Sequence, residues 1–509
     1  MRSRFGVGIA VMLAGLLCIL GIALLLRDDQ PPDPTPTGER GPTGLDSFYK
    51  QELSWQDCGA SRCTWVRVPI DYELPTGETL RLRVKVRPGD SKQPAGRLFL
   101  NPGGPGGSGV EFVDPFVASS GQAMRRGFDI VGFDPRGVGR STPLTCLSDK
   151  KFDEFTNLDP DPDNDAEIAA LQKGTADLGK ACEKNSGNLA RHVSTLEAAR
   201  DMDILRALLG ETTLDYYGAS YGTQLGATYA QLFPRRVGKM VLDGAIDPTL
   251  SDEQQGFGQA EGFQRALDSY IRDCVKTIAC PLGTDPAAAE QKLGNFLRDL
   301  DNKPLKTDGK RQVTESTAFY GIAVTLYDRI NWSALSAELT AAFRGDGTLM
   351  LYLADQYFSR NPDGSYANNG GQVIYAVRCL DSVGGSSVDE VKALEPTYVK
   401  ASLVFGRQMA WSAIACTDWP FRTGNTQIKI SAEGAAPIVV IGTTRDPATP
   451  YEWSTALAGQ LDSGVLVTRV GDGHTGYHTG NPCIDSIVDR YLLEDVVPRD
   501  GVTCKAPTG

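Results

Sequence analysis

The feature of this sequence that most restricts its fold is a series of short apolar runs alternating with stretches of helical periodicity. Such runs are typical of strands buried on both faces of a parallel sheet that helices cover. Helices are predicted between them, for example at residues 195–209 and 221–232. Two earlier segments, residues 65–70 and 80–86, alternate like antiparallel strands. The predicted buried strands are residues 98–100, 130–133, 214–217, 240–242, 438–441 and 465–470.

The strand pattern is interrupted between Leu242 and Ile438 by nearly 200 residues of mixed helical character. A gap of that length within a sheet indicates an inserted domain and not a loop. We therefore expect an α/β fold with a mostly parallel central sheet and a large helical cap between the sixth and seventh strands. The predicted parts are a signal segment at 1–29, a Pro-rich linker at 30–44, the first part of the core at 45–250, the cap at 251–430 and the rest of the core at 431–509.

The N-terminus predicts export from the cytoplasm. After Arg2 and Arg4 an uncharged, mostly apolar run spans residues 5–26, against roughly 20 residues needed to cross a bilayer. No A-x-A cleavage site follows it, so we favour an uncleaved signal anchor over a cleaved signal peptide. A lipid on Cys18 is a third alternative, and all three place the folded part outside the cytoplasm. The prolines of the following linker keep it extended.

Cysteine usage agrees with export. The chain has eleven cysteines, and ten remain when Cys18 in the apolar run is set aside. An even set in an exported chain indicates disulfides, although sequence alone leaves their connectivity open. Neighbouring positions suggest the pairs Cys58–Cys63, Cys146–Cys182, Cys274–Cys280, Cys379–Cys416 and Cys483–Cys504.

Composition argues against two classes of partner. The net charge is −12 and no basic patch is evident, whereas nucleic-acid binding requires a basic face. With no CxxC motif, no Cys/His cluster and three histidines in all, we expect no metal site. Membrane contact is expected through the N-terminal segment only.

The first chemical signal is the G-x-S-x-G motif at Gly218-Ala219-Ser220-Tyr221-Gly222, which lies between a predicted strand and a predicted helix. This context is required for a nucleophilic serine, because a sharp strand-to-helix turn displays the hydroxyl above the sheet. The alternative is a glycine-rich turn whose serine caps the helix.

Two further signals also follow core strands. Asp446 comes after the strand at 438–441, and His474 lies between small residues after the strand at 465–470. Taken alone, Asp446 fits an Asp-Pro turn and His474 an ordinary surface histidine. His192 and His478 do not directly follow a core strand, and we interpret both as structural.

The order Ser220, Asp446, His474 is the chain order of the α/β-hydrolase fold. His474 would take the proton of Ser220 and Asp446 would orient the imidazole, so that an acyl-enzyme forms and is hydrolysed without a cofactor. The backbone N–H groups of Tyr221 and Gly104 are the candidate oxyanion donors.

The loop that contains Gly104 has a rival interpretation. Gly104, Gly106 and Gly109 satisfy G-x-G-x-x-G, and Asp134 follows at about the place of a ribose-binding acid. Pro105 within the motif argues against a dinucleotide site, and no G-K-[ST] motif is present. We therefore expect no nucleotide.

Motifs spread from Leu98 to Cys504 carry a family resemblance. They are NPGGPGGSG, FDPRGVGRST, AARDMDILRALLG, YYGASYGTQLGATYAQLFP, VLDGAIDP, RCLD, CTDWP and IGTTRDPATP followed by GHTG. The chain resembles the secreted tripeptidyl aminopeptidases of actinobacteria, a branch of the proline-iminopeptidase-like α/β-hydrolases of peptidase family S33. The resemblance implies a triad of Ser220, Asp446 and His474, a helical cap and a TAP-like C-terminal segment. Pro102 stands where iminopeptidases have histidine, a change that keeps the backbone donor.

The resemblance also implies a substrate, since this family releases short peptides from free N-termini. An exopeptidase must bind the substrate ammonium, which requires carboxylates near the pocket. The candidates are Asp243, Asp381 and Asp418, each of which also fits a surface or capping role. Two alternatives stay open: a carboxylesterase or lipase with the same triad, and a non-catalytic surface protein.

Overall fold

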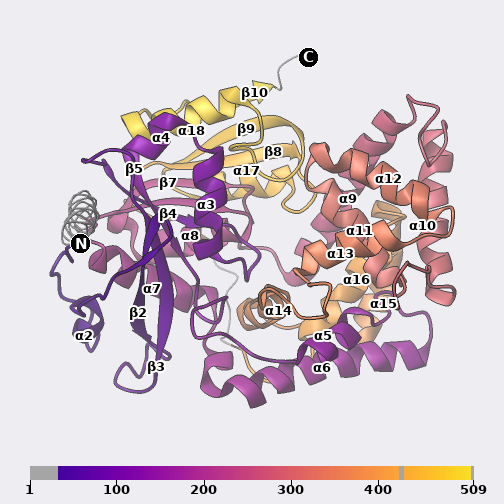
Figure 1. Cartoon of the computed structure of the whole chain (residues 1–509), viewed down its shortest axis with the longest axis horizontal. Coiled ribbons are helices and arrows are strands. Elements are labelled where there is room, and N and C mark those ends of the chain that lie inside the picture. The colour runs from indigo at the N-terminus through magenta and orange to yellow at the C-terminus, as the bar shows by residue number, and fades with distance from the viewer. Residues whose placement is uncertain (1–32, 423–428, 506–509) are drawn as a thin grey trace, which may run out of the picture. The chain divides into compact units, whose positions relative to one another are not determined.

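A computed structural model describes residues 33–422 and 429–505. Ten of its strands form one sheet in the order β1-β2-β3-β5-β4-β6-β7-β8-β9-β10 (Figure 1). The pairs from β5 through β4 to β10 are parallel, whereas β1, β2, β3 and β5 pair antiparallel. The strands are β1 (Gln56–Cys58), β2 (Ser61–Pro69), β3 (Thr79–Arg87), β4 (Gly96–Asn101), β5 (Phe128–Phe133), β6 (Leu214–Ala219), β7 (Val237–Asp243), β8 (Ile438–Arg445), β9 (Gly464–Asp472) and β10 (Val502–Lys505).

The predicted α/β-hydrolase fold is confirmed, and every predicted strand is present. Strands β1 and β10 were not predicted, because they have only three and four residues and no continuous apolar run. The large insertion lies between β7 and β8. These are the sixth and seventh of the predicted strands, the first of which was placed at residue 65. The predicted position of the insertion is therefore confirmed.

Helices cover both faces of the sheet. Alternate residues of each buried strand enter opposite layers: Tyr216 packs among side chains of α7 and α8, and Tyr217 among those of α3 and α18. This alternation is why the buried strands are apolar at successive positions. The helices around the sheet are α2 (Asp46–Tyr49), α3 (Gly109–Ser119), α4 (Gln122–Gly127), α7 (Thr195–Leu208), α8 (Tyr221–Leu232), α17 (Tyr451–Gln460) and α18 (Pro482–Glu494).

The insertion is a helical cap with a hydrophobic core of its own, seen to the right of the sheet in Figure 1. Ile168, which precedes the insertion, is part of that core, so an earlier helix also contributes to the cap. The predicted limits of 251 and 430 did not include it. The cap helices are α9 (Asp252–Cys274), α10 (Pro286–Asn302), α11 (Glu315–Leu326), α12 (Trp332–Ala342), α13 (Thr348–Phe358), α14 (Gly370–Asp381), α15 (Val388–Ala401) and α16 (Gly406–Trp411), joined by α5 (Asp149–Thr156) and α6 (Asp165–Ser186).

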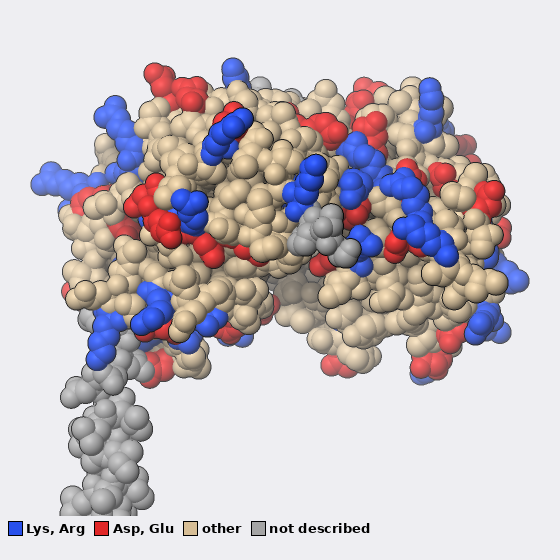
Figure 2. Space-filling view, turned by 90° about the horizontal axis from the view of Figure 1, so that it is seen from above, with Lys and Arg blue, Asp and Glu red and all other residues tan. Residues whose placement is uncertain are grey.

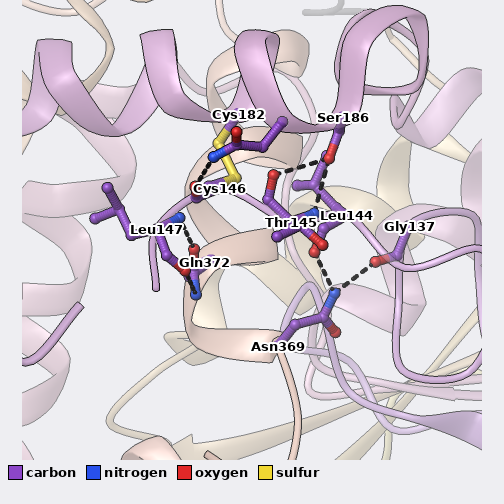
Figure 3. The surroundings of a disulfide bond; sticks show 10 residues. Gly137, Leu144, Thr145, Cys146, Leu147, Cys182, Ser186, Asn369 and Gln372 are labelled. Atoms are coloured by element: carbon purple, nitrogen blue, oxygen red, sulfur yellow. Dashed lines mark hydrogen bonds between the residues drawn. A yellow bond between two sulfur atoms is a disulfide. The ribbon is translucent and has the colours of Figure 1, made fainter. Parts of the chain in front are cut away.

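The described residues contain five disulfides, and their pairs are the five that neighbouring positions suggested. Cys146–Cys182 joins the segment after β5 to α6 (Figure 3). Cap helix α14 packs against the same segment through Gln372. Its amide oxygen accepts from the Leu147 N–H at 2.7 Å, and its amide nitrogen donates to the Leu147 carbonyl at 3.2 Å. Such a set of disulfides indicates an oxidising, extracytoplasmic compartment.

The proposed signal segment at 1–29 lies outside the described residues. Within residues 33–422 and 429–505, no helix has the length and apolar character to cross a membrane. Figure 2 shows one face of the molecule, on which basic and acidic side chains are interspersed and neither sign forms a continuous area.

A buried ionic network joins the helices that flank the serine turn. The Asp203 carboxylate on α7 is fully buried and accepts hydrogen bonds from Tyr49 at 2.5 Å and from Tyr229 of α8 at 3.2 Å. It also accepts from Arg206 at 2.9 Å and from Arg236. Because two guanidinium groups converge on one carboxylate, removing its charge leaves both of them with Glu39, a partly exposed carboxylate, as their remaining acidic partner.

We expect Asp203→Asn to lower the apparent free energy of unfolding by about 3–5 kcal/mol for that reason. Urea unfolding followed by tryptophan fluorescence measures it. The control is Asp46→Asn, which breaks an exposed pair with Lys50 and should change stability by less than about 0.5 kcal/mol. Equal unfolding midpoints for the two variants would contradict a stabilising network.

Candidate active site

Ser220 occupies a strained turn between β6 and α8. Its φ of 55° and ψ of −126° lie outside the regions that most residues adopt. The flanking glycines permit this turn: a Cβ on Gly218 would collide with the Gly222 carbonyl oxygen, and one on Gly222 would lie 2.7 Å from that of Asn101. The G-x-S-x-G spacing therefore follows from backbones that pass too closely for any side chain.

His474 and Asp446 meet at the carboxyl ends of β8 and β9. The Nδ1 of His474 lies 2.9 Å from both carboxylate oxygens of Asp446. Asp446 is fully buried, and its oxygens also accept from the N–H groups of Ala448, Thr449 and Thr475 at 2.9 to 3.1 Å. These donors fix the direction of the carboxylate.

The environment of His474 suits a base. Burial alone would lower its pKa, but the charge and hydrogen bond of Asp446 outweigh burial, so the pKa is raised. The other ring nitrogen, Nε2, is buried and has no hydrogen-bond partner among residues 33–422 and 429–505. His474 and Ser220 line one cavity, in which a neutral imidazole can activate a hydroxyl.

Asp243, at the end of β7, connects the serine turn to the loop that contains His474. Its backbone carbonyl accepts from the Ser220 N–H at 2.9 Å. Its fully buried carboxylate accepts from the N–H groups of Gly476 at 2.8 Å and Tyr477 at 2.9 Å, and from the Tyr217 hydroxyl at 3.0 Å. Burial raises the pKa of Asp243 to about 6.

The predicted substrate-binding acids are not on the cavity wall. The Asp243 carboxylate lies beneath the histidine loop, and that of Asp381 accepts from the N–H of Thr195 at 3.1 Å, at the start of α7. Asp418 is exposed and does not line the cavity either. The expectation that these acids meet the substrate ammonium is therefore corrected. Asp243 ends a strand, and the other two acids each follow a cysteine of the motifs by two residues. This pattern does not distinguish a carboxylate that binds the protein backbone from one that binds the substrate.

The glycine-rich loop after β4 passes directly over the serine turn. A Cβ on Gly103 would lie 2.8 Å from the Cβ of Ser220. Gly104 and Gly106 have φ values of 114° and 103°, which only glycine adopts readily. In the described part of the chain, the N–H groups of Gly104 and Tyr221 donate to no other residue. Both are available to a ligand oxygen.

Asp134, the acid that a dinucleotide site would require, is fully buried. It accepts hydrogen bonds from Ser108 at 2.5 Å and from the N–H of Arg140 at 2.9 Å. Its carboxylate thus holds the glycine-rich loop and is not open to a ribose.

The cavity has a volume of about 670 Å³ and lies between the sheet edge and the cap. Ser220, His474, Gly104 and Gly106 form the core side. Among the described residues, the wall has no aspartate or glutamate, and Arg378 is its only lysine or arginine. The cap contributes mainly aromatic side chains, among them Phe319, Tyr320, Tyr327, Tyr357, Tyr375 and Trp411.

An acidic cluster that sequence analysis missed lies next to this wall. Asp159, Asp301 and Glu315 place one oxygen each within 4.8 Å of one another, close enough to hold a cation. Burial raises the pKa of all three. Leu158 and Pro160, which flank Asp159, and Ser316, which follows Glu315, line the cavity. No sequence signal marked this cluster, since its members come from three separate segments.

The remaining histidines have other partners. His192 Nδ1 lies 2.7 Å from Glu197, and the ring of His478 stacks on Tyr477. Burial lowers the pKa of His478 to about 4. Neither lines the cavity.

Comparison with known proteins identifies the family. Residues 401–504 match the family model described as TAP-like protein. The serine protease Hip1 of Mycobacterium tuberculosis is 35% identical over 89% of this chain and 91% of its own length. Carboxylesterase B of M. tuberculosis is 37% identical over 89% and 90%, and the tripeptidyl aminopeptidase of Streptomyces coelicolor is 32% identical over 89% and 86%.

These relatives share most of their length with this chain and differ in the activity that their names state. All three names describe hydrolases, and one of them names a serine enzyme. The chain therefore belongs to the TAP-like family of α/β-hydrolases and is a serine hydrolase.

Proposed function

We propose that this protein is an extracytoplasmic serine exopeptidase that releases short peptides from free N-termini, with Ser220 as nucleophile, His474 as base and Asp446 as orienting acid. One observation carries the proposal: His474 is bound through Nδ1 to a buried carboxylate and presents an unpartnered Nε2 in the cavity that contains the strained Ser220. The segment 1–29 would tether the enzyme to the membrane or be removed on export.

The reaction follows from these groups. The neutral imidazole of His474 takes the hydroxyl proton as Ser220 attacks the scissile carbonyl. The N–H groups of Gly104 and Tyr221 stabilise the tetrahedral oxyanion, each worth about 3–4 kcal/mol in the transition state. Protonated His474 then donates to the leaving amine, and water hydrolyses the acyl-enzyme by the same base.

The cap supports a substrate with a short acyl part. A cavity of about 670 Å³ is of the size that encloses a small ligand, so a long chain would have to leave it. The acidic cluster of Asp159, Asp301 and Glu315 adjoins this cavity and is the candidate site for a substrate ammonium. A relative named tripeptidyl aminopeptidase supports three residues as the released unit.

A carboxylesterase is the second candidate, and one observation favours it. The described cavity wall has no carboxylate to pair with an ammonium, and it is rich in aromatic rings. A relative named carboxylesterase B has 37% identity to this chain. Both activities would use the same acyl-enzyme chemistry.

Substrate competition separates the two candidates. For an exopeptidase, a tripeptidyl aminocoumarin with a free N-terminus should be hydrolysed at least about 100-fold faster, by kcat/KM, than its N-acetylated form, because acetylation removes the charge. The control is Ser220→Ala, which should leave neither amide hydrolysed. Turnover of p-nitrophenyl esters with no turnover of either amide would favour the carboxylesterase.

The pH profile tests the base. Since His474 must be neutral to accept the proton, activity should fall as the pH drops through its raised pKa, above the ordinary value of 6.5. Asp446→Asn removes the charge that raises this pKa, so the acidic limb of kcat/KM should move to lower pH and kcat should fall by roughly 10⁴.

The matched control for that experiment is Asp472→Asn. Asp472 lies two residues from His474 and pairs with Arg445 at 2.5 and 2.9 Å, not with the imidazole. Its neutralisation should leave the acidic limb in place. A limb that moves equally in both variants would count against Asp446 as the orienting acid.

A further inference from the structure

The described cavity wall carries a positive side chain, although the substrate of an exopeptidase brings a positively charged ammonium. Among the described residues that line it, Arg378 of α14 is the only lysine or arginine, and no acidic side chain joins it. The rest of the wall is mostly aromatic or aliphatic, and the amides of Gln259, Gln356 and Gln408 are further polar members of it.

The guanidinium of Arg378 is incompletely paired. Its nearest charged partner is Asp252, whose carboxylate lies 3.7 Å from Nε, and the arginine side chain is one-third exposed. In the part of the chain that the structure describes, Arg378 donates no hydrogen bond, and one oxygen of Asp252 is buried without a partner. The two terminal nitrogens of Arg378 are thus available to a planar anion, the geometry that carboxylates satisfy bidentately.

The helix that carries Arg378 is fixed at both ends. At its start, Asn369 donates to the carbonyls of Gly137 and Leu144 at 2.8 Å each (Figure 3), and Gly370 packs directly on Gly106 of the glycine-rich loop. At its end, the Asp381 carboxylate accepts from the N–H of Thr195 at 3.1 Å.

The disulfide Cys379–Cys416 adds a covalent tie next to Arg378. Because the backbone that carries Arg378 is held in place before any substrate arrives, binding an anion costs little ordering of the helix.

We propose that Arg378 binds a carboxylate of the acyl part of the substrate, so that the enzyme prefers released segments that contain an acidic side chain. This inference rests on the proposed hydrolysis at Ser220 and specifies its substrate class. The carboxylate would replace the weak contact of Arg378 with Asp252 and would exclude water from the guanidinium. Arg378 is thus a specificity-determining residue and takes no part in the bond-breaking steps.

The test compares Glu with Gln at each of the three positions of a tripeptidyl aminocoumarin, whose leaving group has no carboxylate. For the wild-type enzyme, kcat/KM should favour Glu by about tenfold or more at one position, as expected for a hydrogen-bonded charge. Arg378→Gln should abolish that ratio, and Arg378→Lys should keep part of it. The control Arg265→Gln changes an arginine that pairs with Glu452 off the cavity wall, and should keep the full ratio.

Two results would overturn the proposal. One is a Glu-to-Gln ratio of one or less at every position in the wild-type enzyme, and the other is a ratio that survives Arg378→Gln. A peptide-length series with free or amidated C-termini distinguishes the source of the carboxylate. A preference for the free C-terminus that disappears in Arg378→Gln, with no Glu preference, would place the carboxylate on the leaving side and contradict the acyl-side assignment.

An ester pair separates this proposal from the proposed peptidase function. Mono-p-nitrophenyl glutarate and its methyl ester differ only in the free carboxylate and require no peptide hydrolysis. If no peptide amide is cleaved but the free acid is hydrolysed faster in an Arg378-dependent manner, the peptidase proposal fails and the role of Arg378 stands. If peptides are cleaved without any carboxylate preference, the role of Arg378 fails alone.

Discussion

The geometry of this active site depends on one buried residue, Asp243. Its carbonyl holds the N–H of Ser220, while its carboxylate holds the N–H groups of Gly476 and Tyr477 just after His474. Two segments more than 250 residues apart are thereby fixed to one strand end. Complete burial opposes the charge and raises the pKa of Asp243, and three hydrogen-bond donors offset that cost. The strained Ser220 turn and the histidine loop are both held at this point.

The cap helices form the other side of the cavity. Helix α14 starts against Gly106 of the glycine-rich loop and ends at Thr195 of α7, so the cavity wall is built on the same segments as the catalytic turn. The core side of the cavity presents Ser220, His474 and free backbone donors, and the cap side presents aromatic rings and Arg378. The proposed catalytic groups and the aromatic wall therefore come from different parts of one chain.

Much of the fold could be predicted because a buried parallel sheet has a strong apolar signature. The candidate triad could be predicted because Ser220, Asp446 and His474 follow core strands in a fixed order. Strand β1 could not be predicted, because it is short and polar. The contribution of Ile168 to the cap could not be predicted either, because it depends on packing between segments that are distant in the sequence. Asp243 was assigned to the substrate for the same reason: a carboxylate after a strand looks alike in sequence whether it faces the cavity or the backbone beneath it. Arg378 belongs to the RCLD motif, but only the cavity shows what surrounds it.

The central claim is that Ser220 is the nucleophile of this site. The most direct measurement is to react the enzyme with a fluorophosphonate, digest it and locate the adduct by mass spectrometry. We predict a single adduct on Ser220, formed at a rate that falls on acidification as His474 becomes protonated. No adduct, or an adduct on another serine that persists in Ser220→Ala, would contradict the account.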